Sequence, residues 1–428
     1  MIKKISAMQC GLFLFLSIIS LKFLVFPSIF SQYAYRDLYF PVLIGLIIDL
    51  FFTIVVVNII IKNPHLTFKE LLTRAFGKTF AKIALMFLFV YFFVKGVVIV
   101  KETHNYFNET LFESINWFLF IIPLFFLMGF IMLKNFRAIG RSLQFLGPLM
   151  LLALLFTILI PLSEADFSNL LPMFENGASG IFKAVFFCSF TFGDYFVLFL
   201  FMGRINIKPN SKKTIMWYVV CADVLVFAFY VVFAGIFGNL GLNHSLALSE
   251  IIMHTMVSTS TGSINWINIM IWLFILFFEM GVMFLCSSNI LTQVFKFKSR
   301  YVPMLIILSL LLLAVVYLYL SLIKTINIIT SVPFCIFVIV LQVLMPLACF
   351  VASKKLSGKN KITLSQVYNT KVVKYQLTNI SGTTTSKIFV SEKRFVKHFK
   401  TKTTKSAKTK KLNSSANKLA NKSEVQNA

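Results

Sequence analysis

The sequence contains little charge and very few acidic residues. Only 13% of its 428 residues are charged, and 15 Asp and Glu stand against 41 Lys and Arg; a soluble domain carries about 25% charged residues. Glycine is also scarce, with 18 residues, which excludes collagen-like and glycine-rich low-complexity proteins. Apolar residues make up 58% of the chain, more than one soluble core can bury. This composition predicts a polytopic membrane protein.

The chain also lacks the residue patterns of metal sites and enzymes. Its six cysteines all lie in apolar runs, without the spacing of a metal clamp or a secreted disulfide framework. Its five histidines are scattered, and we find no nucleophile–base pair and no phosphate-binding loop. We therefore expect no metal, no cofactor and no enzymatic activity.

Ten stretches are long and apolar enough to cross a membrane, which takes about 20 residues each. They are residues 8–30, 38–61, 79–100, 115–133, 143–162, 178–201, 214–238, 264–290, 301–323 and 327–351. A backbone in lipid must satisfy its own hydrogen bonds, so each stretch is expected to be helical. No small-residue cleavage site follows the first stretch, which we expect to be retained as a span. The fold class predicted is an all-α bundle of ten transmembrane helices in two halves of five.

Basic residues alternate between the two sides of this bundle. The even-numbered connections and the N-terminal segment hold 17 Lys and Arg against one acid, whereas the odd-numbered connections hold three against eight. Because basic loops stay in the cytoplasm, both termini are predicted to be cytoplasmic.

The chain is predicted to divide into a membrane domain, residues 1–351, and a basic tail, residues 352–428. The tail holds 18 Lys and Arg against two acids and has few apolar residues, which predicts disorder. Such a tail attracts anionic lipid. Nucleic acid is the rival partner through counterion release, but no motif for specific nucleic-acid binding occurs.

The first span carries polar residues at a depth where they are costly and usually functional. Ser17 and Ser20 precede Leu21 and Lys22, and Lys22 lies far from either end of the span. Pro27 follows; it removes a backbone donor and clashes with the carbonyl one turn earlier, which favours a kink or a break near Phe23. We expect an interrupted helix here, with a simple proline kink as the alternative.

The sixth span contains a second polar patch. Ser189, Thr191 and Gly193 lead into the intramembrane acid Asp194, so this span has both a place to unwind and side chains to satisfy the freed backbone. A glycine packing notch is the alternative. Interrupted helices at matching positions of two halves indicate the central site of a transporter, where half-helix ends bind charged ligand groups.

Three further acids lie in apolar spans: Asp49 in the second, Asp223 in the seventh and Glu279 in the eighth. Together with Lys22 they are candidates for an ion or proton relay, and structural pairing is the alternative. Lys95 lies nearer the outer end of its span, so we expect it to extend to the membrane surface.

Two other features lie on the predicted outer side. Lys183 is near the outer end of its span and is expected to reach the surface in the same way. The connection formed by residues 239–263 interleaves apolar and polar residues, which predicts a helix at the membrane interface. A lid or a partner contact are the alternatives.

Several short stretches occur in a fixed order along the chain. They are Ile5-Ser6-Ala7-Met8-Gln9, Pro27, Arg36-Asp37, residues 64–70 with Gly77-Lys78, Asn169-Leu170-Leu171-Pro172, and Phe192-Gly193-Asp194. In this order the chain, over about residues 5–351, resembles the spore germination permease family, the B subunit of germinant receptors. That family belongs to the amino acid–polyamine–organocation transporter superfamily.

The resemblance implies a 5+5 inverted repeat of the leucine-transporter type, with helices 1 and 6 broken. It implies an amino acid germinant whose carboxylate meets the backbone of residues 17–21 and whose ammonium meets residues 189–193. The substrate-binding candidates are therefore Ser17, Ser20, Leu21, Lys22, Ser189, Thr191, Gly193 and Asp194. It further implies an A subunit and a C-subunit lipoprotein as partners, in the inner membrane of a spore.

One departure from the superfamily concerns ions. The glycine pair usual in the first unwound segment is replaced by Ser17 and Ser20, and Lys22 stands close to where related transporters bind sodium. This suggests ion-independent or proton-linked behaviour. The leading hypothesis is a germinant receptor subunit for a small zwitterion. An amino acid uptake transporter and a non-transporting membrane scaffold are the alternatives, and the identity of the ligand is open.

Overall fold

The computed structural model describes residues 4–110, 117–244, 246–254, 258–259, 262–263, 265–318 and 322–380. The chain forms two units, Met1–Ser357 and Gly358–Ala428. The helix Val332–Ile380 continues past the predicted domain boundary at residue 351, so residues 352–380 are helical and not disordered as predicted. The rest of the basic tail, residues 381–428, lies outside the described residues, and its disorder and its lipid binding stay predictions.

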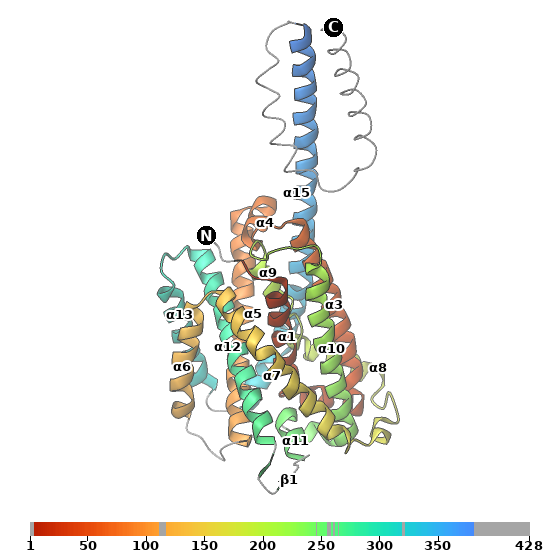
Figure 1. Ribbon diagram of the computed structural model, residues 1–428. Coiled ribbons are helices and arrows are strands. Elements are labelled where there is room, and N and C mark those ends of the chain that lie inside the picture. Colours follow the sequence, from red (N-terminus) through yellow and green to blue (C-terminus); the bar gives the residue numbers. More distant parts are fainter. Residues whose placement is uncertain are drawn as a thin grey trace, which may run out of the picture. The chain divides into compact units, whose positions relative to one another are not determined.

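Almost all described elements are helices (Figure 1). The α-helices are α1 (Ala7–Phe23), α2 (Phe26–Ala34), α3 (Tyr39–Lys62), α4 (Phe68–Phe76), α5 (Lys78–Thr110), α6 (Trp117–Leu133), α7 (Phe136–Leu162), α8 (Gly177–Phe187), α9 (Phe196–Phe201), α10 (Ser211–Phe237), α11 (Ala247–His254), α12 (Asn265–Phe295), α13 (Tyr301–Leu318), α14 (Leu322–Ile329) and α15 (Val332–Ile380). The short elements are the 3-10 helices η1 (Tyr35–Leu38), η2 (Phe167–Leu170), η3 (Ser189–Thr191) and η4 (Gly238–Asn243), and the strands β1 (Ser258–Thr259) and β2 (Gly262–Ser263), which pair antiparallel.

The predicted all-helical membrane fold is confirmed. Among the described residues, six helices are long and apolar enough to span a membrane, and a seventh candidate, α8 with Ser189–Phe201, is bent by 50°. Three shorter apolar helices, Ala7–Phe23, Leu119–Leu133 and Tyr301–Val315, account for the remaining predicted spans. The first span is interrupted between α1 and α2, and the sixth between α8 and α9, as predicted.

The first span lies at the centre of the bundle. Every residue of α1 from Gln9 to Phe23 is buried, and the helix packs on α10, α7 and α12 (Figure 1). A helix that is apolar all round is expected in such a position. The outer helices instead expose large side chains, such as Phe126 and Phe145, which are each 78% exposed.

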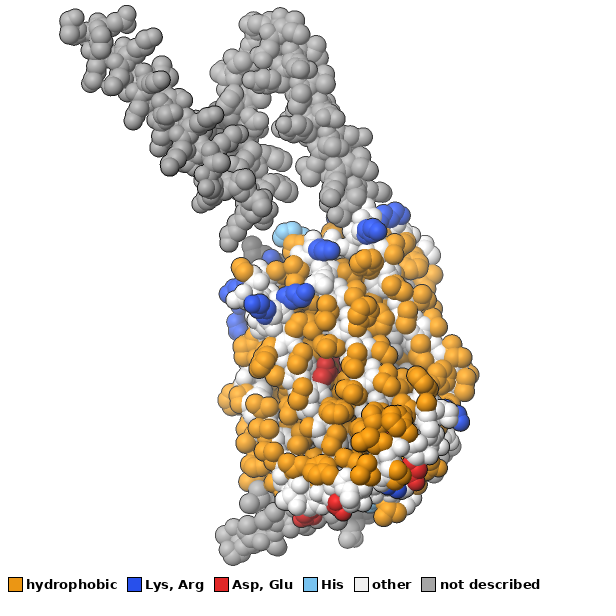
Figure 2. Space-filling view, turned by 90° about the vertical axis from the view of Figure 1, so that its right-hand side faces the viewer, with side chains coloured by type: hydrophobic (Ala, Val, Ile, Leu, Met, Phe, Trp, Pro, Cys, Tyr) orange, Lys and Arg blue, Asp and Glu red, His pale blue; other side chains and the backbone are white. Residues whose placement is uncertain are grey.

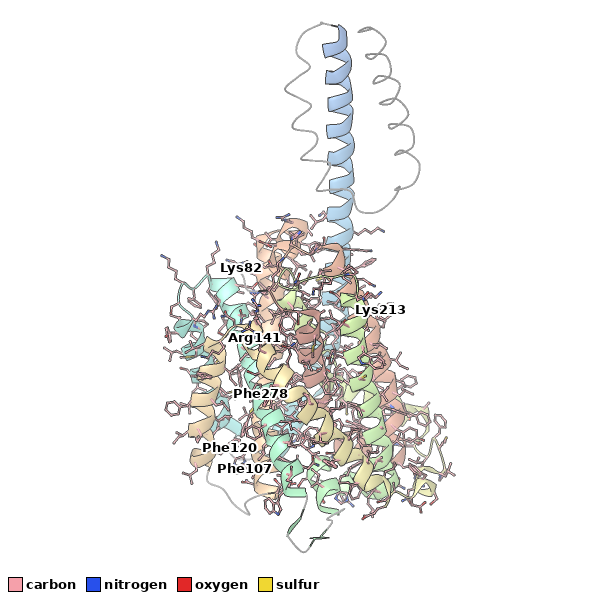
Figure 3. All side chains as sticks on the ribbon, in the orientation of Figure 1. Lys82, Phe107, Phe120, Arg141, Lys213 and Phe278 are labelled. Atoms are coloured by element: carbon pink, nitrogen blue, oxygen red, sulfur yellow. The ribbon has the colours of Figure 1, made fainter. Side chains whose placement is uncertain are left out.

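The surface separates the two signs of charge. In Figure 2 the middle of the molecule is hydrophobic, most visible Lys and Arg side chains lie near one end, and most Asp and Glu lie near the other. Lys82, Arg141 and Lys213 lie towards the basic end, and Phe107 and Phe120 lie towards the opposite end (Figure 3). A cytoplasmic location of the basic end stays a prediction from the loop charges.

The prediction of an interfacial helix in the long outer connection is wrong. Leu246, Leu248 and Ile251 of this segment are fully buried, and α11 packs on α7, α2 and α5. The N–H of Ala247 donates to the carbonyl of Leu24 at 3.1 Å. The break after α1 leaves this carbonyl without a helical partner, so α11 satisfies it and is drawn into the bundle.

Close packing near the sixth span gives a first test. A Cβ at Gly45 of α3 would lie 2.0 Å from the ring of Phe192, so only glycine fits there. Gly45→Ala is expected to lower the free energy of unfolding by about 1–2 kcal/mol, because the ring must move. Gly129→Ala is the matched control, since a Cβ there meets nothing nearer than 3.7 Å. Equal melting temperatures for the two purified variants would contradict this packing.

Candidate functional site

The break in the sixth span begins where α8 ends at Phe187. The chain passes through η3, becomes extended at Phe192, and turns at Gly193 with φ of +89°. This left-handed conformation favours glycine, because other residues carry a Cβ that clashes with the backbone. The turn brings Asp194 into the centre of the bundle before α9 begins at Phe196.

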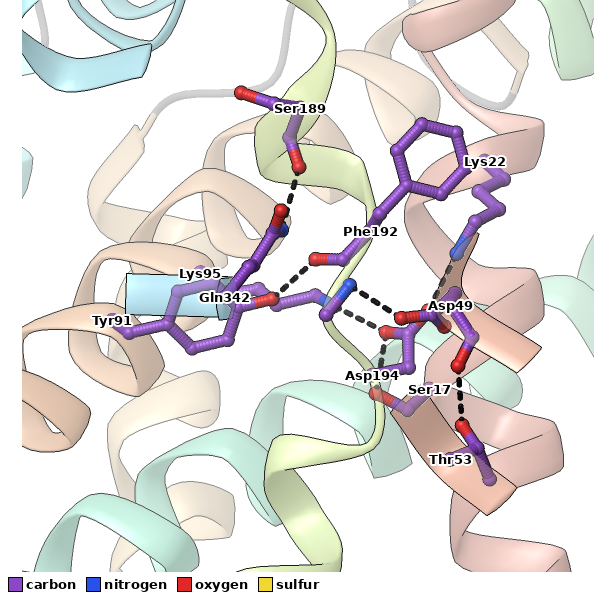
Figure 4. Close-up of polar contacts among 11 residues, drawn as sticks. Ser17, Lys22, Asp49, Thr53, Tyr91, Lys95, Ser189, Phe192, Asp194 and Gln342 are labelled. Carbon is purple, nitrogen blue, oxygen red and sulfur yellow. Dashed lines mark hydrogen bonds and ion pairs between the residues drawn. The ribbon is translucent and has the colours of Figure 1, made fainter. Parts of the chain in front are cut away.

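Asp194 is the centre of a buried ion-pair network (Figure 4). Its Oδ2 accepts from Lys22 Nζ at 2.5 Å, and its Oδ1 accepts from Ser17 Oγ at 3.0 Å and from Lys95 Nζ. The side chains of Lys22, Lys95 and Asp194 are each 1% exposed. Lys22 also lies over the ring of Phe192, 5.4 Å from its centroid. A buried charge is tolerated only when it is paired in this way.

Asp49 of α3 belongs to the same network. Its Oδ1 accepts the backbone N–H of Gly193 at 2.9 Å (Figure 4). It also interacts electrostatically with both Lys22 and Lys95, as Glu279 of α12 does. The network joins α1, α3, α5 and the break of the sixth span.

Two polar side chains hold the open backbone of the break in place. Tyr91 Oη donates to the carbonyl of Phe192 at 2.7 Å, and Gln342 Nε2 donates to the carbonyl of Ser189 at 2.8 Å (Figure 4). Neither residue was predicted from the sequence. Gln342 could have been noticed, because it is a polar amide inside the apolar tenth span, whereas Tyr91 cannot be distinguished by sequence from the many other aromatic residues.

The prediction that Lys95 extends to the membrane surface is wrong. Its helix, α5, continues beyond the predicted span to Thr110, so Lys95 lies in mid-helix and not near an end. Its side chain turns inward to Asp194 because that carboxylate provides a buried partner. Lys183, in contrast, is exposed.

The first break lies close to Phe23, as Pro27 predicts, but the residues that the resemblance implies to be unwound remain helical. Ser17, Ser20 and Leu21 lie within the continuous helix α1, so the backbone of residues 17–21 is not unwound and its N–H groups are not free for a carboxylate. The chain breaks at Leu24 instead, where φ is −83° and ψ is −109°. Pro27 lies in the first turn of α2, where a missing N–H costs little, and the break therefore precedes it.

The remaining candidates fall into two groups. Ser20 Oγ and Thr191 Oγ1 are buried close to the two breaks and have no hydrogen-bond partner in the described part of the chain. Glu279 of α12 is fully buried near Ser17 and Lys95 but forms no ion pair with a described residue. Asp223 of α10 is also outside the bonded network.

Lys95 provides a second test. Lys95→Met is expected to lower the free energy of unfolding by about 2 kcal/mol, because Asp194 loses one charged donor but keeps Lys22 and Ser17. Lys183→Met removes an exposed lysine and serves as the control. Denaturant unfolding of the purified variants gives both values. A Lys95 variant as stable as the Lys183 variant would mean that the buried pair contributes nothing.

Comparison with known proteins identifies the type of fold. The profile of a family described as spore germination proteins matches residues 4–329. No curated protein sequence matches the chain. The structure is similar to that of a mutant manganese transporter from Eremococcus coleocola, at 10% identity, with a TM-score of 0.54 and coverage of 78% of this chain and 76% of the transporter. It is also similar to MhsT in complex with L-phenylalanine, at 13% identity, with a TM-score of 0.55 and coverage of 80% and 97%. The ten-helix leucine-transporter fold is thus confirmed.

Proposed function

This chain belongs to the family of spore germination proteins, and from that premise we propose that it is the membrane subunit of a germinant receptor. We propose that it binds a small amino-acid-like germinant between the broken first and sixth spans. The observation that carries the proposal is the buried network of Lys22, Lys95, Asp49 and Asp194 at the break of the sixth span.

A zwitterion fits this network better than an anion or a cation does. An inserted amino acid brings one positive and one negative group, so it adds no net charge to the buried site. In our proposal the carboxylate of the ligand takes the ammonium of Lys22, and its ammonium takes the oxygen of Asp194 that Lys22 releases. The free hydroxyls of Ser20 and Thr191 are available as further partners. The bound L-phenylalanine of MhsT, a protein of similar fold, supports an amino acid as the ligand class.

Signalling then follows from differential affinity. A ligand shifts an equilibrium between two arrangements of the bundle only if it binds one of them more tightly. Because Lys22 lies on α1 and Asp194 lies on the sixth span, opening their ion pair changes the contact between these two segments. In our proposal this change passes to an A subunit and a C-subunit lipoprotein in the inner membrane of the spore, with both termini cytoplasmic.

Proton coupling is favoured over sodium coupling. The ammonium groups of Lys22 and Lys95 occupy both carboxylate oxygens of Asp194, which a sodium ion would otherwise coordinate. Glu279, a buried carboxyl group without an ion pair among the described residues, is the proposed group for proton exchange. Sodium is expected to leave ligand affinity unchanged in purified protein, as measured by equilibrium binding in sodium and in potassium buffers. A sodium-dependent affinity would rule out this arrangement.

Reconstituted vesicles test the proposed function against its rivals. Labelled amino acids are added to vesicles that contain the purified chain, with Lys183→Met as an active control and empty vesicles as the blank. Saturable binding without accumulation supports a receptor subunit. Net accumulation inside the vesicles instead indicates an uptake transporter, the second candidate function. Failure to bind any small zwitterion indicates a non-transporting scaffold.

A further inference from the structure

A polar cavity of about 380 Å³ lies at the basic end of the bundle, away from the Asp194 network. It is lined by the start of the first span, by the first turns of α7, and by the segment that follows α9. Three of its lining side chains are cations, Lys4, Arg137 and Arg141, and none of its lining residues is acidic. Cavities that bind small molecules have volumes of about 300–1,000 Å³, so the space suits a specific ligand.

No described residue neutralises the three cations. None of them takes part in an ion pair with a described residue, and all three side chains are exposed. Helices α1 and α7 both begin at this cavity, and their N-termini add positive partial charge. Such a concentration of unpaired positive charge favours an anion that several arginines can bind with paired hydrogen bonds, which is typical of phosphate groups.

Hydrogen bonds between side chains and backbone groups of several segments hold the floor of the cavity together. Gln9 Oε1 accepts the N–H of Ser6, and Gln9 Nε2 donates to Gln144 Oε1 at 3.2 Å, which joins α1 to α7. A Cβ at Gly140 would lie 3.1 Å from the side chain of Gln9, so the two helices approach closely here. Ile5 pairs with the segment after α9, with its N–H donating to Arg204 and its carbonyl accepting from Asn206.

A large exposed apolar side chain lies one helical turn from the cavity. Phe145 follows Arg141 by one turn of α7, about 6 Å along the axis, and is 78% exposed. A headgroup phosphate of a neighbouring lipid would therefore meet Arg141 while its acyl chains meet Phe145. We propose that this cavity is a binding site for a phosphate-bearing anion, most simply the headgroup of an anionic phospholipid.

An occupant of this site would contact both interrupted spans. Lys4 and Ser6 precede α1, and Asn206 follows α9, so the bound phosphate links the ends of the first and sixth spans on the basic side. Binding is thus expected to stabilise the arrangement in which these ends lie together.

The test compares two double variants of the full chain, purified in an uncharged detergent at about 0.15 M salt, where non-specific attraction to surface charges is screened. Arg137→Gln/Arg141→Gln removes two cavity cations. Lys82→Gln/Lys213→Gln removes two basic residues from the same end, outside the cavity (Figure 3). The probes are dioctanoyl phosphatidylglycerol, dioctanoyl phosphatidylcholine and inorganic phosphate. The readouts are equilibrium binding and the shift in melting temperature.

We expect phosphatidylglycerol to bind the natural chain and the lysine variant alike, and to bind the arginine variant at least tenfold more weakly. Phosphatidylcholine is expected to bind weakly to all three. If inorganic phosphate also binds, and loses affinity for the arginine variant in the same way, the phosphate group alone is sufficient for recognition. If only phosphatidylglycerol binds, the ligand of this site is a lipid. The proposal is overturned if neither phosphatidylglycerol nor inorganic phosphate binds the natural chain. It is also overturned if both double variants lose affinity for phosphatidylglycerol equally.

Discussion

Asp194→Asn is expected to lower the free energy of unfolding by about 3–5 kcal/mol and to abolish ligand binding. The substitution leaves the ammonium groups of Lys22 and Lys95 buried without their carboxylate partner, and uncompensated buried charge is strongly destabilising. The shape of the side chain is conserved, so the loss reports charge and not packing. Denaturant unfolding of purified protein and equilibrium binding of labelled amino acids measure the two effects.

A second substitution sharpens this prediction. The double variant Asp194→Asn/Lys95→Met removes one charge of each sign, so that one buried ammonium group, that of Lys22, has lost its carboxylate partner and not two. It is expected to be more stable than Asp194→Asn alone, although it still fails to bind ligand. Asp166→Asn, a change at an exposed acid outside the bundle, is the control and is expected to bind normally. If the free energies of unfolding lost in the two single variants simply add in the double variant, Asp194 and Lys95 are not coupled.

Gly193→Ala is expected to cost about 2–4 kcal/mol and to weaken ligand binding at least tenfold. The backbone must hold φ at +89°, which costs a non-glycine residue about 1–2 kcal/mol. The added Cβ would lie 3.0 Å from Gln342 Nε2 and 3.1 Å from Tyr91 Oη. These two groups hold the open carbonyls of the break, and displacing them adds the cost of about two hydrogen bonds.

Gly177→Ala is the matched control for this substitution. Gly177 also has a positive φ, +61°, but a Cβ there meets no atom within 4 Å. It should therefore cost only the backbone strain, about 1–2 kcal/mol, and leave ligand binding intact. Equal losses of stability and binding in both variants would show that the space around Gly193 has no special role.

The sequence predicted those features that stand out against an apolar background. Lys22 and Asp194 could be recognised because ionisable residues are costly inside a membrane. Their direct contact could be expected only because two interrupted spans at matching positions were expected to meet. The helical ranges were predictable for the same reason, since length and apolarity alone mark a span.

The missed features depend on neighbours that sequence patterns do not reveal. Lys95 was taken for a surface-directed residue because its distance from the end of α5 was underestimated. The first break lies near Phe23, where Pro27 was expected to place it, but the backbone of residues 17–21, which the resemblance implied to be unwound, stays helical. The segment formed by residues 246–252 buries its apolar side chains in the bundle and donates a hydrogen bond to the carbonyl of Leu24, a partner that appears only when the break is known.

The position of a bound amino acid is the most direct test of the proposed site, and an experimental structure of the chain with such a ligand would provide it. We expect the carboxylate of the ligand beside Lys22 and its ammonium beside Asp194, with the ion pair between these two residues opened. A ligand bound elsewhere, with the Lys22–Asp194 pair intact, would contradict recognition by the two interrupted spans.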